Sequence, residues 1–384
     1  MSELSGLPAQ GTTRRPTLPS LTGMRFIAAF SVFALGCVYY LFASPDPIVF
    51  EGSWHAAAGG VSYFFILSGF ILAWSAPAGD TNRRFWRRRF FKIYPNHLIT
   101  FVVAVVLIAL MAPEAAVDSW IAIPNLLLIQ SWFPGLDVRG SFNGVAWSLS
   151  CEALFYFCFP FLQRLVDRIR PTALWWWAGG VVAVIFAIPA LSAAIGPVQE
   201  PLSPILGLTA WDSYVVYQLP PVRMLEFVFG IILARIVMNG QRLPLGFGGA
   251  VVLVIAAFAL KPIIPPAYAT VAITVVPLGL LVAAGAVADN TKKRTGLANR
   301  VMVWLGEISF ALYMWHYMVL LVGYHLLIEG KGLSTAATIG IAVGLFGISI
   351  VVSWLQYTMI ERPIMRKFAR PRQPAPAPKQ PAAA

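Results

Sequence analysis

Charged residues are scarce in this sequence of 384 residues. Only 11% of the residues are charged, whereas a typical soluble domain has about 25%. Hydrophobic residues make up 58% of the chain, and the mean hydropathy is +0.74. This composition excludes a soluble globular domain and indicates a polytopic membrane protein.

Cysteine and acidic residues are also few. The three cysteines, Cys37, Cys151 and Cys158, lie in apolar runs, and their odd number supports neither a disulfide framework nor a metal site. The 16 acidic residues stand against 28 Lys and Arg, which gives a formal net charge of +12. In a membrane protein such an excess orients the spans, so we expect membrane lipid but no nucleic acid as a partner.

Apolar runs of about 20 residues, the length that crosses a bilayer, recur about ten times along the chain. The predicted spans are 22–43, 57–76, 91–112, 145–163, 173–195, 221–238, 246–261, 268–288, 302–327 and 333–358. One further run, from Trp120 to Trp132, is interrupted by Pro124 and Asn125. If this run does not cross, nearly all basic loops fall on one side, as the positive-inside tendency requires. The prediction is an all-α polytopic membrane protein with about ten transmembrane helices and both termini cytoplasmic, in the bacterial inner membrane.

The two ends of the chain differ from its middle. Residues 1–20 are polar and Pro-rich, and residues 364–384 form a basic tail rich in Pro and Ala. Neither composition buries much apolar surface, so both ends are expected to be disordered. The membrane domain is predicted to span residues 21–363.

A few charged or titratable residues lie within the predicted spans, namely Arg25, Glu152, Arg223, Glu226 and His316. A buried Arg or Glu costs a few kcal/mol unless it is paired or hydrated. Such residues either hold helices together or line a polar cavity. Arg223 and Glu226 are three residues apart and share a helix face, so they can simply pair with each other.

A basic tract precedes the third predicted span. Its residues are Arg83, Arg84, Arg87, Arg88, Arg89 and Lys92, with Phe85, Trp86, Phe90 and Phe91 between them. One interpretation is a topology anchor that holds anionic lipid. The other is a site for a phosphate-bearing cytosolic ligand such as coenzyme A, because guanidinium groups bind phosphate bidentately. The tract alone leaves both open.

Seven strings in order carry a resemblance to a known family. They are LTGMRFIAAFSVFAL (21–35), GVSYFFILSGFIL (60–72), RRRFFKIYP (87–95), VAWSLSCEALFYFCFP (145–160), RMLEFVFG (223–230), ISFALYMWH (308–316) and IERP (360–363). The chain resembles the acyltransferase 3 family of integral membrane O-acyltransferases, most closely the actinobacterial enzymes that acylate macrolides. The resemblance implies transfer of an acyl group from acyl-CoA, a co-substrate rather than a bound cofactor, to a hydroxyl of a sugar, glycan or macrolide-type acceptor.

The resemblance also implies roles for individual residues. Glu152 and His316 match positions expected to be catalytic. Substrate-binding roles are implied for Arg25, Ser68, Arg88, Arg89, Trp147, Ser148, Arg223, Glu226 and Tyr313. Lys92 stands where the family commonly has a second arginine.

One position departs from the family pattern. The family places its catalytic histidine eleven residues after the arginine of span one, and this position is Gly36 here. An alcohol needs a base of pKa near 7 to attack a thioester, and glycine supplies none. Cys37 points about 100° away around the helix. The missing side chain predicts an imidazole-sized space beside Gly36, and three alternatives stay open: a replaced histidine, another base such as His316, or a noncatalytic carrier or binding pseudoenzyme.

Overall fold

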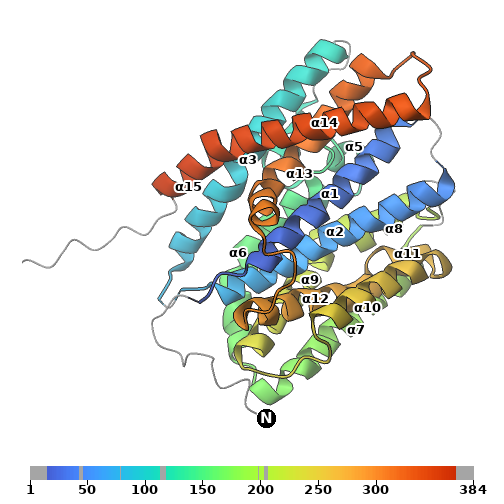
Figure 1. The fold of residues 1–384 in the computed structure, drawn as a ribbon. Coiled ribbons are helices and arrows are strands. Elements are labelled where there is room, and N and C mark those ends of the chain that lie inside the picture. The colour runs from blue at the N-terminus through green and yellow to red at the C-terminus, as the bar shows by residue number, and fades with distance from the viewer. Residues whose placement is uncertain are drawn as a thin grey trace, which may run out of the picture.

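The computed structural model of the protein describes residues 15–42, 46–77, 79–112, 118–197, 199–202 and 206–368. These residues are mostly helical, and no β-strand occurs among them. The long helices stand side by side in one bundle, and the connections from α3 to α6 and from α7 to α9 contain short helical elements (Figure 1). The all-α prediction is confirmed.

Each predicted span lies in one long helix. The long helices are α1 (Pro19–Leu41), α2 (Pro47–Trp74), α3 (Asn82–Met111), α6 (Trp147–Asp167), α7 (Leu174–Ile195), α9 (Pro220–Met238), α10 (Phe247–Leu260), α12 (Ala272–Asn290), α13 (Arg300–Leu327) and α14 (Thr335–Gln356). Eight helices of the described chain are long and apolar enough to cross a membrane. The two others are α10, which has 14 residues, and α9, which carries Arg223, Glu226 and Arg235. Which side of the membrane holds the termini stays a prediction.

The run from Trp120 to Trp132 forms no spanning helix. It is divided between α4 (Ser119–Leu126) and the 3-10 turn η1 (Gln130–Trp132), followed by α5 (Leu136–Arg139). An eight-residue helix is about 12 Å long, less than half of a hydrocarbon core of about 30 Å. The segment therefore enters the bundle without crossing it.

Arg139 links this segment by a hydrogen bond to the loop that contains Ala210. Its side chain is 1% exposed, and its guanidinium donates to the carbonyl oxygens of Pro134 and Ala210, both at 3.2 Å. Burial lowers the pKa of Arg139 to about 10. The side chain still carries its charge near neutral pH and holds the two loops together.

Short elements complete the chain. They are η2 (Pro171–Ala173), α8 (Ala210–Asp212), the π-helix η3 (Ser213–Gln218), η4 (Lys261–Ile263), α11 (Pro266–Thr270), the π-helix η5 (Tyr357–Glu361) and α15 (Arg362–Phe368). Most of them cap or extend a long helix. The two π-helices each form a wider turn directly before a helix that carries charged residues: η3 precedes α9, and η5 precedes α15.

The core lies where α2 crosses α9, and α1 packs beside both α2 and α13 (Figure 1). Close approach at the α2–α9 crossing depends on Gly69 and Gly230. A Cβ atom added to Gly69 would lie 2.0 Å from the Phe227 carbonyl oxygen, and one on Gly230 would lie 2.0 Å from that of Ile66. Small residues at such crossings let membrane helices pack backbone against backbone. This contact fixes the centre of the bundle.

The prediction of disorder at the N-terminus is wrong for its last residues. Helix α1 begins at Pro19, and the Ser20 hydroxyl donates to Asp289 on α12 at 2.5 Å. Arg15 lies over the ring of Trp74, 5.2 Å from its centroid. These contacts compensate for the polar composition that favoured disorder. Residues 1–14 lie outside the described chain.

The predicted C-terminal tail also begins too early. Helix α14 continues through η5 into α15, so residues 364–368 are helical rather than disordered. Phe368 stacks on Phe91 of α3 with ring centroids 4.5 Å apart, and this burial of apolar surface orders the segment. Residues 369–384 lie outside the described chain.

Candidate active site

A polar cavity lies inside the bundle, between α1, α2, α3, α6 and α13. It has a volume of about 90 Å³. Its polar lining residues are Arg25, Lys92, Ser148, Glu152, Tyr156 and Tyr313. Four of these residues were predicted as site residues from the sequence, and the fold brings them together from three helices.

Glu152 is the acidic group of this inner cavity. It lies one helical turn before Tyr156 on α6, and the positive charges that act on it come from Arg25, Arg89 and Lys92. A carboxylate inside a membrane protein needs such compensation, because an unpaired buried charge is costly. Three cations from two helices therefore converge on one carboxylate.

Two hydroxyl groups of the cavity lining, Ser148 on α6 and Tyr313 on α13, are fixed by hydrogen bonds. The hydroxyl oxygens of Ser148 and Tyr313 lie 2.9 Å apart. Each also reaches the carbonyl oxygen of Val145, at 3.0 and 3.1 Å. These hydroxyls are placed to hydrogen-bond a polar group that enters the cavity.

The predicted residues Ser68 and Trp147 support the cavity from behind. Ser68 donates to the Tyr156 hydroxyl at 3.4 Å. The Trp147 ring packs edge-on against Phe65, which lines the cavity, with centroids 6.3 Å apart. Both residues contact the lining and lie outside it.

A larger cleft of about 320 Å³ adjoins the inner cavity. Its lining residues are Arg25, Lys92, Glu307, Tyr357, Glu361, Arg362, Met365 and Arg366. Arg25 and Lys92 line both spaces, so their side chains form the neck between the cleft and the cavity. With four cations and two carboxylates, the cleft carries a net positive charge. Its walls come from the N-terminal halves of α1, α3 and α13 and from η5 and α15.

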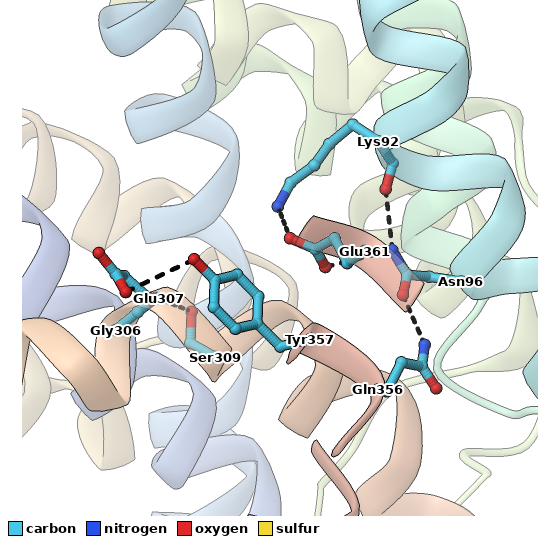
Figure 2. A network of polar contacts seen from close by, with 8 residues as sticks. All are labelled: Lys92, Asn96, Gly306, Glu307, Ser309, Gln356, Tyr357 and Glu361. Atoms are coloured by element: carbon cyan, nitrogen blue, oxygen red, sulfur yellow. Dashed lines mark hydrogen bonds and ion pairs between the residues drawn. The ribbon is translucent and has the colours of Figure 1, made fainter. Parts of the chain in front are cut away.

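Figure 2 shows the polar contacts along one wall of this cleft. The Lys92 ammonium donates to Glu361, and Glu361 also accepts from the Asn96 side-chain amide at 3.2 Å. Across the cleft, the Tyr357 hydroxyl donates to Glu307 at 3.5 Å. The network joins α3, α13 and the π-helix η5. In the sequence, Lys92 belongs to the basic tract and Glu361 to the IERP string, and no role was predicted for Asn96, Glu307 or Tyr357.

Arg88 and Arg89 belong to the basic tract at the start of α3, where both side chains are half-buried and contact different partners. Arg88 forms an ion pair with Asp80. Arg89 lies over the Tyr156 ring, 5.7 Å from its centroid. Neither arginine lines the cleft or the inner cavity, and only Arg89 contacts a residue of a lining, Tyr156 of the inner cavity, so direct phosphate contact by these two arginines stays a prediction.

Arg223 and Glu226 do not line the inner cavity. They form an ion pair at 2.9 Å, each side chain is 1% exposed, and Arg223 donates to Ser62 at 3.1 Å. They border a separate space of about 10 Å³, enough for one water molecule. The expectation that they line the cavity is wrong, because their spacing places them on one face of α9, packed against α2. The simpler interpretation, a pair that holds helices together, describes their geometry.

Gly36 faces His316 across the α1–α13 contact. A Cβ atom added to Gly36 would lie 3.6 Å from Cδ2 of His316 and 2.6 Å from Cδ1 of Leu320. The predicted imidazole-sized space is therefore absent, because Leu320 fills it. Nδ1 of His316 lies 2.7 Å from the Tyr313 carbonyl oxygen, which can only accept, so Nδ1 carries the proton and Nε2 keeps the lone pair. His316 does not line the inner cavity but lies next to Tyr313, which does.

The fold and the site define a multi-pass helical membrane protein with a polar cavity that opens into a positively charged cleft. The chain belongs to the acyltransferase 3 family, whose acyltransferase domain matches residues 18–358. It is thus an acyltransferase-family protein of the bacterial cell membrane.

Three relatives indicate the range of the family. The acyltransferase MdmB of Streptomyces mycarofaciens is 41% identical over 372 residues, covering 94% of this chain and 95% of the relative. The peptidoglycan O-acetyltransferase OatA of Listeria monocytogenes is 23% identical over 92% of this chain and 57% of its own length. The O-acetyltransferase OatA of Staphylococcus aureus is also 23% identical, over 91% of this chain and 57% of its own length. No solved structure matches this chain.

Proposed function

We propose that this protein transfers an acyl group from acyl-CoA to a hydroxyl of a sugar or macrolide-type acceptor. The acceptor hydroxyl oxygen attacks the thioester carbonyl carbon, the carbon–sulfur bond breaks, and coenzyme A leaves as the thiol after gaining a proton. Membrane O-acyl transfer is the chemistry that the family and its named relatives share. The donor and the acceptor are the proposed parts.

The observation that carries the donor assignment is the neck at Arg25 and Lys92. These two cations line both the cleft and the inner cavity. Charge-assisted bonds to phosphate are strong, so a donor whose phosphates occupy the cleft would extend its thioester end past the neck to Glu152. Arg362 and Arg366 would add phosphate contacts in the cleft, and Arg88 and Arg89 would add contacts from the basic tract of α3.

Within the cavity we assign Glu152 as the group that receives the acceptor proton. It is the carboxylate of the inner cavity, and the Ser148 and Tyr313 hydroxyls line the same cavity, where either would turn its proton from the Val145 carbonyl oxygen to bind the thioester carbonyl. Glu152 would remove this proton without the imidazole that the family pattern places at position 36, so one proton-transfer group is missing from the site. Transfer by a chain with Gly36 is therefore expected to be slow.

A second candidate is a noncatalytic member of the family that binds the donor or carries an acyl group. The observation that favours it is Gly36, since Leu320 fills the position of the family histidine.

One experiment separates the two candidates. Coenzyme A binding is measured by calorimetry on the purified protein, and transfer is followed by thiol release from acetyl-CoA and by mass spectrometry of a macrolide or glycoside acceptor. Binding with acceptor-dependent thiol release supports the acyltransferase. Binding without acylated product, at any protein concentration, supports the noncatalytic candidate. Failure to bind coenzyme A would refute the donor assignment.

A further inference from the structure

Glu361 is an acidic residue in a cleft whose proposed ligand is a polyanion. Its side chain is 2% exposed, and its two carboxylate oxygens have different partners. One accepts from the Lys92 ammonium, and the other accepts from the Asn96 side chain at 3.2 Å. A negative charge so close to a neck cation opposes the binding of phosphate.

The carboxylate is held in place from the side opposite Lys92. Asn96 donates to the backbone carbonyl of Lys92 at 3.0 Å and accepts from Gln356 at 2.6 Å. Gln356 in turn accepts from the Trp315 indole on α13. Asn96 is fully buried, and Gln356 is 3% exposed. Because three helices share this network, Glu361 cannot follow Lys92 when the lysine turns.

Lys92 differs from Glu361 in its freedom. Its ammonium ends a flexible stem of four carbons, it carries three donors, and its side chain is 25% exposed. It lines the cleft and the inner cavity, whereas Glu361 lines the cleft alone. The lysine can therefore exchange the carboxylate for a phosphate while Asn96 keeps the carboxylate hydrogen-bonded.

We propose that Glu361 is a built-in counterion that competes with the donor phosphates for Lys92, weakening the binding of coenzyme A at the neck so that the product can leave. This inference rests on the proposed donor, since it assigns the neck to a phosphate. Binding substrate and product equally tightly does not raise turnover. A competing internal charge keeps coenzyme A from being bound too tightly to leave. Glu361 is thus a positioning residue that acts through Lys92.

The test compares two substitutions that remove the same charge from the same cleft. Glu361→Gln is nearly isosteric and keeps an oxygen that accepts from Asn96, so the network persists. Glu307→Gln removes the other carboxylate of the cleft, which contacts Tyr357 across from Lys92. Coenzyme A binding is measured by calorimetry in nanodiscs, and its release is measured by stopped flow.

Glu361→Gln is expected to bind coenzyme A about tenfold more tightly, mainly through slower release, because a charge a few ångströms from the phosphate is removed. Glu307→Gln should change affinity by less than about twofold, since exposed charges are screened. Glu361→Asp, which withdraws the carboxylate by one carbon, should give an intermediate affinity. A folded Glu361→Gln variant with unchanged or weaker affinity overturns the proposal, and so does equal tightening by Glu307→Gln. If the parent protein binds no coenzyme A, the donor assignment fails, and this inference fails with it.

Discussion

Restoring a histidine at position 36 is the most direct test of the site. The substitution Gly36→His places an imidazole where α1 faces His316 and Leu320. General base catalysis by a positioned group contributes about 10²–10⁴-fold. If the chain lacks only its base, acyl transfer should rise by at least about 10²-fold.

Leu320 determines how the substitution must be made. Its Cδ1 would lie 2.6 Å from the new Cβ, and its side chain is fully buried, so the ring of Gly36→His displaces it. The single variant should therefore lose stability, as overpacked cores do by about 1–3 kcal/mol. Adding Leu320→Ala removes three side-chain carbon atoms next to the new imidazole ring. Although Leu→Ala alone costs about 2–5 kcal/mol in a core, the imidazole refills the space, so the double variant should be more stable than either single variant.

The assay is acetyl-CoA-dependent acylation of a macrolide or glycoside, with melting temperature and coenzyme A affinity measured on the same preparations. The matched control is Gly36→Phe with Leu320→Ala, which fills the same space with a ring that cannot accept a proton. The reasoning is refuted if the histidine double variant folds and binds coenzyme A yet transfers no faster than the phenylalanine control.

Three further predictions test the topology, the cleft and the cavity. With cytoplasmic termini, a cysteine introduced at Ala210 should face outward and react with a membrane-impermeant maleimide in intact cells, whereas a cysteine at Lys292 should not react. The reverse labelling pattern would contradict cytoplasmic termini. Arg366→Ala should weaken coenzyme A binding about tenfold, since a charge-assisted bond is worth about 1.5–3 kcal/mol, whereas Lys367→Ala, outside the cleft on the same short helix, should have no effect. Glu152→Gln in the histidine-restored chain should keep its melting temperature and coenzyme A affinity and lose turnover; loss of folding instead would argue for a structural role.

The helices were predictable because a bilayer imposes a length on every apolar span. Their ends were not, because apolar runs do not mark where a helix leaves the membrane. Helix α3 was expected from residue 91 but begins at Asn82, where the Thr81 side chain caps it by accepting from the Arg84 amide at 3.3 Å. The basic tract is thus helical, and α15, which continues α14 beyond η5, packs on this tract through Phe368 and Phe91.

Individual site residues were predictable from the resemblance, while their grouping was not. Arg25, Ser148, Glu152 and Tyr313 all line the inner cavity. Arg223 and Glu226 follow an equally good motif but pair with each other. Spacing within one helix shows which residues share a face and does not show whether that face meets a cavity or another helix.

The pairing of Lys92 with Glu361 was not predictable from the sequence, because the two residues are distant in the chain and meet only in the folded bundle. Lys92 and Glu361 are 269 positions apart. Glu361 reaches the lysine from the π-helix η5, whose wide turn also directs Tyr357 across the cleft toward Glu307 (Figure 2). A sequence pattern with regular α-helical periodicity cannot place both side chains, because a π-turn shifts the face that follows it. The irregular backbone of η5 therefore determines which charges meet in the cleft. Substitution of Glu361, the partner of Lys92, is expected to change coenzyme A affinity while the protein stays folded.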